Sequence, residues 1–232
     1  MWQAVVLIPN GEKDYQGIGL VEGMWKVVAE LLNFRLTASI IFQDFLHGFR
    51  AGPGTGTATL EAKPLQQLAD LREEDLYVIF LDLHKASDSL DRSRCLEILE
   101  GYGVSPQAQR IIQTYCRWLT MVARAGGYYG TEFQGARGVT QGNPLSPTIF
   151  NVVVDAVVQH WLTVVIVGVE ERGKRGQEGR HHASLFYADG DMVTLSDSCY
   201  LQGAFNILVG LFDRVGLRTN FGKTVGMVCR PY

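Results

Sequence analysis

Apolar residues recur along the chain in short runs that predict strands. The clearest run is Tyr77 to Leu81, which leads directly into Asp82. Such a run is typical of a buried central strand, and a carboxylate at its end would lie at the floor of any cleft there. Similar runs predict further strands at residues 4–8, 17–20, 121–126, 128–133, 183–187 and 192–195, and a final pair within 217–229.

Apolar residues at intervals of three and four predict helices between these strands. Asp88 or Ser89 is expected to cap the helix after the central strand, because either side chain can accept the first free backbone N–H groups. The apolar stretch Ile149 to Val169 contains polar residues, which favours a buried helix and strand over a membrane span. The predicted helices cover residues 21–36, 57–71 with a kink or restart at Pro64, 88–100, 105–119, a segment from about 148, and 202–215.

The order of these elements predicts the fold class. Strands and helices mix without strict strand–helix–strand alternation, which favours an α+β fold with helices on one face of a mainly antiparallel sheet. The chain has 232 residues and 47% hydrophobic content, enough for one large domain or two small ones with a substantial core. Asp189-Gly190, flanked by apolar residues, predicts a hairpin turn.

Charge and cysteine content narrow the function classes. The net charge of −3 is not the overall basicity of a typical nucleic-acid binder, so such binding would need a local basic patch or a missing partner. The four cysteines are far apart and form no CxxC pair, which argues against a zinc site and a disulfide framework. They are expected to be small buried thiols in a reducing compartment. With no secretory signal or membrane span in view, we expect an intracellular protein.

Acidic residues follow two of the predicted strands. Asp82 ends the central strand, and Asp189 and Asp191 follow the strand at 183–187. If the strands are neighbours, the carboxylates converge, and clustered carboxylates normally need a cation. Oxygen ligands suit Mg²⁺ or Mn²⁺, and paired ions can support phosphoryl transfer. A plain hairpin turn and a strand-end carboxylate explain the same acids without chemistry.

Four motifs follow one another along the chain: FLDLHKASD (80–88), GVTQGNPLSPTIFN (138–151), FYADGD (186–191) and GLRTNFGKT (216–224). In this order they resemble the palm motifs of reverse transcriptases, most closely the group II intron and non-LTR retroelement type. VVLIPNGEKDYQGIGL (5–20) and HGFRAGPGTGTA (47–58) resemble fingers segments of that group. The glycine-rich second segment matches neither nucleotide-binding fingerprint.

The resemblance implies a right-hand polymerase fold. The fingers would occupy about residues 1–75 and the palm 76–232, with the assignment of about 105–140 open between them. The helical thumb of the family would be absent, so we expect a fingers–palm unit that is a fragment or a decayed element copy.

The resemblance also implies catalytic and metal-binding residues. Asp82 and Asp189 would hold Mg²⁺ or Mn²⁺, with the backbone carbonyl of Leu83 beside them and Asp191 as a further candidate ligand. Lys223 would lie near the triphosphate and protonate the leaving pyrophosphate. The implied reaction is attack of a primer 3′-hydroxyl on a deoxynucleoside triphosphate, templated by RNA.

Binding residues are implied in the same way. Arg50 would contact the template strand. A glycine in the nucleotide pocket allows close backbone approach. The implied nucleotide-binding residues are Ser87, Gln141, Gly142 and Lys13.

Several positions depart from the family pattern. The family has adjacent aspartates at the hairpin, whereas here Gly190 takes the second place and Asp191 follows. One step along a strand turns a side chain to the opposite face, so Asp191 either rescues the site or misses it. Ser87 replaces an aromatic residue that blocks the ribose 2′-hydroxyl, which predicts weaker rejection of ribonucleotides. Asn10 and Gln16 replace cations that contact the triphosphate, which weakens charge-assisted bonds.

Three functional hypotheses remain open. The first is a reverse transcriptase domain, impaired or not, with RNA template, DNA primer and deoxynucleotides as partners and no membrane. The second is a non-catalytic, retroelement-derived module that binds nucleic acid or protein. The third is an RNA-directed RNA polymerase, which shares the palm but fits QGNPLSP less well. The sequence does not predict the oligomeric state.

Overall fold

The computed structural model describes residues 2–9, 15–50, 55–125, 127–171, 183–187, 190–195 and 198–231. The chain forms two compact units, each built from two segments. Unit 1 comprises Met1–Ile41 and Ser87–Val153, and unit 2 comprises Phe42–Ala86 and Val154–Tyr232. The predicted division into fingers and palm at about residue 75 stays a prediction.

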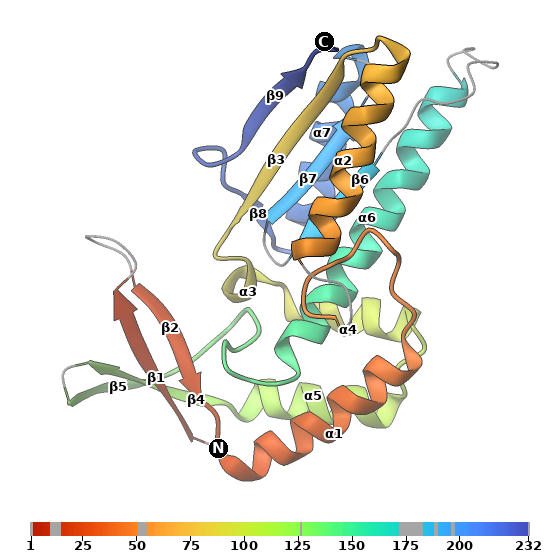
Figure 1. The fold of residues 1–232 in the computed structure, drawn as a ribbon. Helices are drawn as coiled ribbons and strands as arrows, with labels where there is room; N and C mark the ends of the chain where they lie inside the picture. Colours follow the sequence, from red (N-terminus) through yellow and green to blue (C-terminus); the bar gives the residue numbers. More distant parts are fainter. Residues whose placement is uncertain are drawn as a thin grey trace. The chain divides into compact units, whose positions relative to one another are not determined.

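Unit 1 contains a four-stranded sheet in the order β2-β1-β4-β5 (Figure 1). Its hairpins β1–β2 and β4–β5 are antiparallel, and β1 and β4 pair in parallel. The β4–β5 hairpin confirms the prediction for residues 121–133. The strands are β1 (Trp2–Pro9), β2 (Tyr15–Leu20), β4 (Thr120–Ala125) and β5 (Tyr128–Gln134).

Helices α1 (Gly23–Ser39) and α5 (Pro106–Trp118) pack together in unit 1. The rings of Trp25 on α1 and Tyr115 on α5 stack with centroids 4.0 Å apart. Ser105 caps α5, since its hydroxyl accepts the Ala108 N–H at 3.3 Å. This cap explains why α5 begins where the sequence predicts it.

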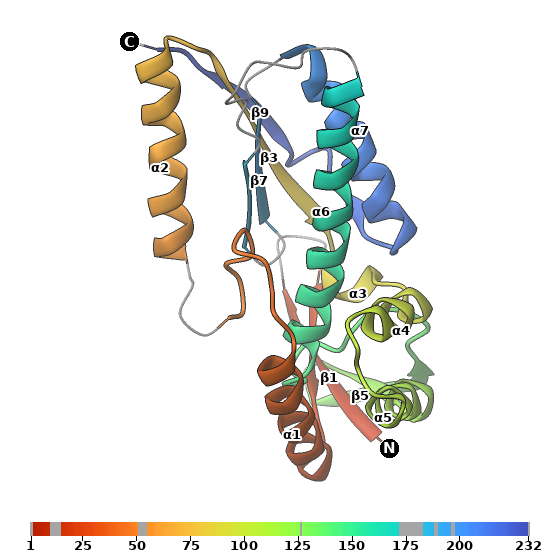
Figure 2. The ribbon, with the colours of Figure 1, turned by 90° about the vertical axis from the view of Figure 1, so that its right-hand side faces the viewer.

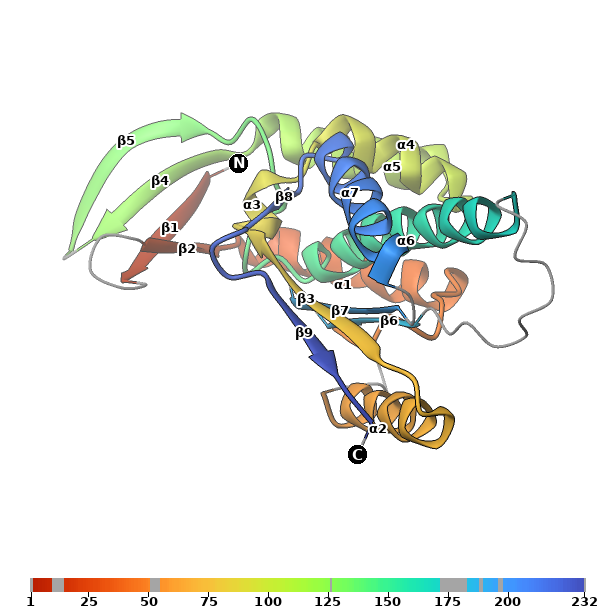
Figure 3. The same cartoon turned by 90° about the horizontal axis from the view of Figure 1, so that it is seen from above.

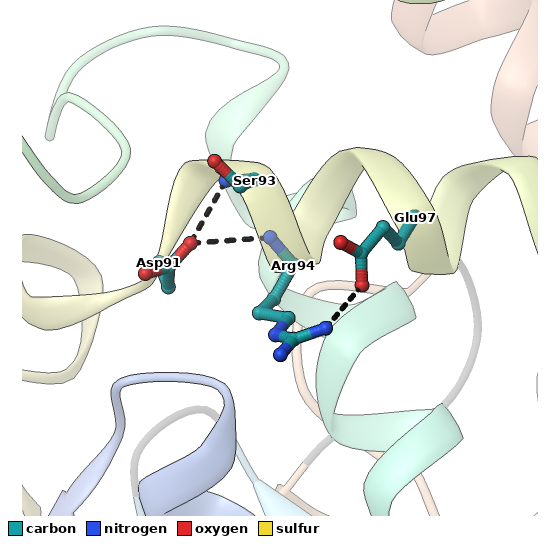
Figure 4. Close-up of polar contacts among 4 residues, drawn as sticks. All are labelled: Asp91, Ser93, Arg94 and Glu97. Atoms are coloured by element: carbon teal, nitrogen blue, oxygen red, sulfur yellow. Dashed lines mark hydrogen bonds and ion pairs between the residues drawn. The ribbon is translucent and has the colours of Figure 1, made fainter.

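Helix α4 (Arg92–Gly101) is capped by Asp91. Its carboxylate accepts the N–H groups of the second and third helical residues at 2.9 and 3.1 Å (Figure 4). The prediction of a cap at Asp88 or Ser89 was wrong, because both residues belong to a separate short turn, α3 (Ala86–Ser89). The chain therefore breaks between α3 and α4, and the cap falls to the last residue before the helix.

Unit 2 contains an antiparallel sheet centred on β3 (Leu76–His84). One side of β3 pairs with β7 (Gly190–Leu195), which in turn pairs with β6 (Ala183–Tyr187). The other side pairs with β8 (Arg218–Thr219) and β9 (Val225–Cys229). The sequence correctly predicts that the run at 77–81 is the central strand.

Helices cover both faces of this sheet. Figures 2 and 3 show α6 (Ser146–Glu171) and α7 (Ser198–Arg214) on one face and α2 (Thr55–Arg72) on the other. The sequence predicts the helix at 57–71 but not that it covers the second face of the sheet. Helix α2 continues through Pro64. Fully buried Trp161 joins α6 to α7, because its indole N–H donates to the Ala204 carbonyl at 2.7 Å.

Helix α6 is continuous from residue 146 to 171 and begins in unit 1. The prediction of a helix followed by a strand within 149–169 was therefore wrong. By length and composition, Ser146–Val165 could cross a membrane, but 67% of this stretch is buried inside the fold. Such burial is typical of a core helix, so the stretch is weak evidence for a membrane span.

Candidate active site

Asp82 lies near the end of β3, as the sequence predicts. Its neighbours Leu81 and Leu83 are buried, whereas Asp82 itself is only partly buried. The alternation of a pleated strand produces this difference, since successive side chains point to opposite faces. Leu81 and Leu83 are thus buried in the core, whereas the Asp82 carboxylate between them lies on the more accessible face of the strand.

The turn between β8 and β9 holds Asp82 through both its side chain and its backbone. The Asn220 side-chain amide donates to Asp82 Oδ2 at 2.9 Å, and the Asn220 N–H donates to the Asp82 carbonyl at 2.8 Å. The Asp82 N–H donates to Thr224 Oγ1 at 3.3 Å. These bonds fix the orientation of the carboxylate.

Sequence analysis missed Asn220 and Thr224 as site residues. Both lie in the GLRTNFGKT motif that contains Lys223, so two polar side chains in the turn were the available signal. The turn closes on itself, because the N–H groups of Lys223 and Thr224 donate to the Asn220 carbonyl at 3.0 and 2.9 Å. Lys223 is exposed in the turn that holds Asp82, and its catalytic role stays a prediction.

The hairpin that carries the other acids pairs with β3 in a defined register. Gly190 opens β7 and lies opposite both Asp82 on β3 and Tyr187 on β6. The hairpin is thus present, but Gly190 belongs to the strand rather than to the turn that the sequence predicts. Its connection, residues 188–189, lies outside the described residues and includes the predicted ligand Asp189.

The register separates positions 190 and 191. Directly opposed residues of antiparallel strands share a face of the sheet. Position 190, a glycine, therefore shares the face of Asp82, and position 191 shares the face of buried Leu81. The register thus places the glycine, and not position 191, where a carboxylate would adjoin Asp82.

A divalent cation is the group that the predicted site implies. Among the described residues, no group of three or more His, Cys, Asp or Glu side chains could hold a metal ion, although Asp189 is not among them. Asp82 Oδ2 accepts from Asn220, and no described residue donates to Oδ1. A carboxylate oxygen with room for another partner suits a hard cation, so Asp82 fits one ligand position of such a site.

In unit 1, the loop of residues 137–143, which contains the predicted nucleotide-binding residues Gln141 and Gly142, packs against residues 87–90, the segment that follows β3. The N–H of Val139 donates to the Ser87 carbonyl at 2.7 Å, and that of Gly138 to the Leu90 carbonyl at 2.8 Å. Ser87 is thus brought beside the loop that contains Gln141 and Gly142. Their nucleotide contacts stay predictions.

Arg92 holds the start of this loop, and sequence analysis missed it. Its guanidinium donates to the carbonyls of Gly138 at 2.9 Å, Cys116 at 3.3 Å and Gly135. An arginine fork is suited to such multiple bonds, because its donors are fixed in one plane. Arg92 therefore ties α4, the end of α5 and the loop together.

The other end of the loop lies against β2. The Gly19 N–H donates to the Gln141 carbonyl at 2.8 Å, and the Gln16 side-chain amide donates to Gln141 Oε1 at 2.7 Å. Gly142 has a φ of 98°, and a Cβ there would collide with the Gly19 carbonyl oxygen. Glycine is required at 142 for this close approach.

A buried polar cluster lies beneath the loop. The Tyr115 hydroxyl donates to Gln3 Oε1 at 3.2 Å and lies 3.4 Å from Thr140 Oγ1. Burial raises the pKa of Tyr115, so its phenol stays a neutral donor at physiological pH. Thr140 immediately precedes Gln141, so the contact between Tyr115 and Thr140 helps to hold the loop in place.

Arg50, the predicted template-binding residue, lies in unit 2. Its guanidinium donates to the carbonyls of Gln43 and Leu46 at 2.8 and 2.9 Å and lies 5.6 Å from the centre of the Phe42 ring. These contacts hold Arg50 against its own loop. Asn10, which replaces a cation of the family, and Lys13, a predicted nucleotide-binding residue, lie outside the described residues.

The thiols of Cys95 and Cys116 are not reactive groups. Burial raises the pKa of Cys95 to about 12 and also raises the pKa of Cys116. The thiolate is the nucleophile and metal ligand, so both thiols are inert at neutral pH. The prediction of buried thiols is thus confirmed for Cys95, whereas Cys116 and Cys229 are only partly buried.

The chain is similar to reverse transcriptases and to proteins of retrotransposable elements. The family described as reverse transcriptase (RNA-dependent DNA polymerase) matches residues 8–231. The Pol polyprotein from the type-2 retrotransposable element R2DM of Drosophila melanogaster is 26% identical over 222 residues, 94% of this chain and 20% of that protein. A type-1 retrotransposable element R2 polyprotein of Popillia japonica is 26% identical over 99% of this chain and 34% of that protein. The chain thus spans a fifth to a third of these relatives.

Solved structures share the fold. Apo telomerase from Candida tropicalis has a TM-score of 0.68 at 14% identity, over 97% of this chain and 44% of that chain. A form truncated from the C-terminal domain has a TM-score of 0.66 at 15% identity, over 98% and 50%. These similarities confirm the predicted α+β fold of the right-hand polymerase type.

Proposed function

The chain belongs to the reverse transcriptase (RNA-dependent DNA polymerase) family, of the non-LTR retroelement type, and we propose that it extends a DNA primer along an RNA template. The observation that supports this activity most is the Asp82 carboxylate, which Asn220 orients at the end of a central strand. A carboxylate held in this way is ready for a divalent cation without further rearrangement.

Reverse transcriptases generally use divalent metal ions, and Mg²⁺ or Mn²⁺ is the proposed cofactor here. Asp82 and Asp189 would hold it, with the Leu83 carbonyl beside them. When bound, the ion activates the primer hydroxyl and offsets charge on the leaving oxygen. The register of β7 pairs Asp82 with Gly190 and Leu81 with Asp191, and Asp189 is proposed as the second ligand on its motif alone.

The chain's own residues would act around one phosphoryl transfer. The primer 3′-hydroxyl gives its proton to solvent water, its oxygen bonds to the α-phosphorus of a deoxynucleoside triphosphate, and the bond from that phosphorus to the leaving pyrophosphate breaks. Asn220 keeps Asp82 oriented during this step, and Lys223 donates the proton that the pyrophosphate takes up. Because Asn220 and Lys223 share one turn, the orientation of the carboxylate and the position of this acid are coupled.

Nucleotide binding would use residues from the loop and from the segment before β2. Gln141 and Gly142 would line the nucleotide site beside Ser87, and Lys13 would contact the triphosphate. Gln16 replaces a cation of the family, and its side-chain amide donates to Gln141 Oε1. This bond would hold the Gln141 side chain in one orientation at the nucleotide site. Arg50 would contact the template strand.

A second candidate is a non-catalytic retroelement-derived module that binds nucleic acid. Gly190 favours it, because the position opposite Asp82 carries no carboxylate. Such a protein would bind an RNA template with DNA primer and leave the primer unextended with either Mg²⁺ or Mn²⁺. Extension with ribonucleotides alone would instead indicate an RNA polymerase.

Primer extension on poly(rA)/oligo(dT) tests the proposal, with Asp82→Asn and Asp75→Asn compared side by side. Asp75 precedes the other end of β3, so its variant makes the same chemical change away from the site. We expect extension that needs Mg²⁺ or Mn²⁺, is lost in Asp82→Asn and survives in Asp75→Asn. Equal extension by both variants would refute the role of Asp82.

A further inference from the structure

Helix α1 of unit 1 is apolar on two opposite sides. Its inner side is buried against the unit and carries Trp25, Ala29, Leu32 and Leu36. Its outer side carries four large apolar residues whose exposed fractions lie between 58% and 74%. These four residues, which we call the outer stripe, are Met24, Val27, Leu31 and Phe34.

The outer stripe has the spacing of a helix-pairing surface. Its members are separated by three, four and three residues, and exposed Ala38 continues the series after four more. This alternation of three and four is the a/d pattern by which two helices pack along a seam. A surface helix of a single domain needs only its inner apolar side, so the second side is left without a structural role in unit 1.

Charged residues flank the stripe in a complementary way. Glu30 and Arg35 take the g and e positions of the heptad pattern and are both exposed. Neither makes an ion pair with another described residue. In a parallel helix pair, a g residue faces the partner's e residue five positions further along. Two Glu30–Arg35 contacts then flank the seam symmetrically.

The same charges disfavour the opposite orientation. An antiparallel pair brings g positions of the two helices together. With Leu31 packed against the partner's Val27, it would bring Glu30 close to the partner's Glu30, and like charges repel. The sequence of α1 therefore fits a parallel pair better than an antiparallel one.

We propose that α1 pairs in parallel with α1 of a second copy of this chain, outer stripe against outer stripe. The contact is isologous and closes on itself, so it yields a dimer and not a fibre. The inner side already holds α1 in helical form, so pairing requires no new helix nucleation. The inference does not depend on the proposed polymerase reaction.

Sedimentation velocity of the 232-residue chain over a range of concentrations tests the dimer. We expect a reversible monomer–dimer equilibrium, and Leu31→Glu should remove the dimer at every concentration reached by the unmodified chain. Lys26→Glu is the matched control, because it also adds a glutamate to the exposed surface of α1 but lies outside the stripe. Circular dichroism shows whether each variant keeps its helices.

A charge-reversal series tests the parallel orientation. Glu30→Arg turns both flanking contacts repulsive and should raise the dimer Kd by roughly tenfold. Adding Arg35→Glu exchanges the charges and should restore the Kd to within about threefold of the original.

Three outcomes would overturn the proposal. The chain could stay monomeric at all concentrations, which would mean that another partner or no partner covers the stripe. Folded Leu31→Glu could dimerise as well as the control. The double reversal could associate no better than Glu30→Arg, which would exclude the parallel seam.

Discussion

The loop of residues 137–143 and the Asp82 end of β3 both carry predicted site residues, but they are held in different ways. Bonds to the backbone hold the loop: those of Val139, Gly138 and Gln141 to neighbouring segments, and the bond that Arg92 donates to the Gly138 carbonyl. At Asp82 a side chain orients the predicted site residue, because the Asn220 amide donates a hydrogen bond to the Asp82 carboxylate. Substitutions in the loop should therefore lower stability, whereas substitution of Asn220 should lower activity at nearly constant stability.

The largest effect should come from the crowded glycine of the loop. In Gly142→Val, a side chain with restricted backbone angles would adopt a φ of 98° and collide with the Gly19 carbonyl. We expect a loss of at least about 3 kcal/mol in the free energy of unfolding. Urea unfolding followed by circular dichroism measures it.

Gly127→Val separates strain from crowding. Gly127 has a similar φ of 86°, but no described atom lies within 4 Å of the point that a Cβ would occupy, so only the conformational strain remains. We expect a loss of about 1–2 kcal/mol there. Equal losses in the two variants would show that contact with β2 does not hold the loop.

Arg92 should have the next largest effect. Arg92→Ala leaves the carbonyls of Gly138, Gly135 and Cys116 without this donor, and we expect a loss of about 2–3 kcal/mol in the free energy of unfolding. Arg94→Ala is the control on the same helix, since its bond to Glu97 joins two exposed side chains (Figure 4). Unfolding midpoints that fall equally in both variants would contradict the role of Arg92.

Asn220→Asp tests the other half of the comparison. The change removes the donor to Asp82 and places a second negative charge beside it. We expect primer extension to slow by roughly tenfold or more while the thermal midpoint changes little. Asn206→Asp makes the same change at an exposed site on α7 and should leave extension intact. Unfolding of Asn220→Asp, or unchanged extension, would remove the distinction between the two regions.

The smallest effect concerns the Cys95 thiol, buried on α4. Its pKa is about 12 in the folded chain and 9.0 for the ordinary thiol, so the unfolded chain binds fewer protons between these values. Stability therefore falls as pH rises through this range. Between pH 8 and 10 the unmodified chain should lose about 1 kcal/mol more than Cys95→Ala. Identical pH slopes in urea unfolding would contradict the burial of the thiol.

Local patterns predicted most of the fold. The central strand that carries Asp82 and the hairpins β4–β5 and β6–β7 follow from apolar runs a few residues long. The prediction failed where two local solutions competed: Asp88, Ser89 and Asp91 can all cap a helix, and only the short turn α3 decides between them. Polar residues within 149–169 likewise suggested a break, although tertiary packing keeps α6 continuous.

The missing parts of the site depend on distant contacts. Asn220 lies 138 residues from Asp82 in sequence, and Gln16 lies 125 residues from Gln141. No local periodicity links such positions, because their meeting depends on which strands pair and in which register. The same register sets Gly190 opposite Asp82, which the motif alone left open.

Primer extension by Gly190→Asp tests the central claim most directly, because it adds a carboxylate at the position opposite Asp82. On poly(rA)/oligo(dT) with Mg²⁺, we expect this variant to extend the primer at least roughly tenfold faster than the unmodified chain. Adding Asp82→Asn should abolish that extension. A variant no faster than the unmodified chain, or extension that survives the loss of Asp82, would contradict a polymerase site built around this carboxylate.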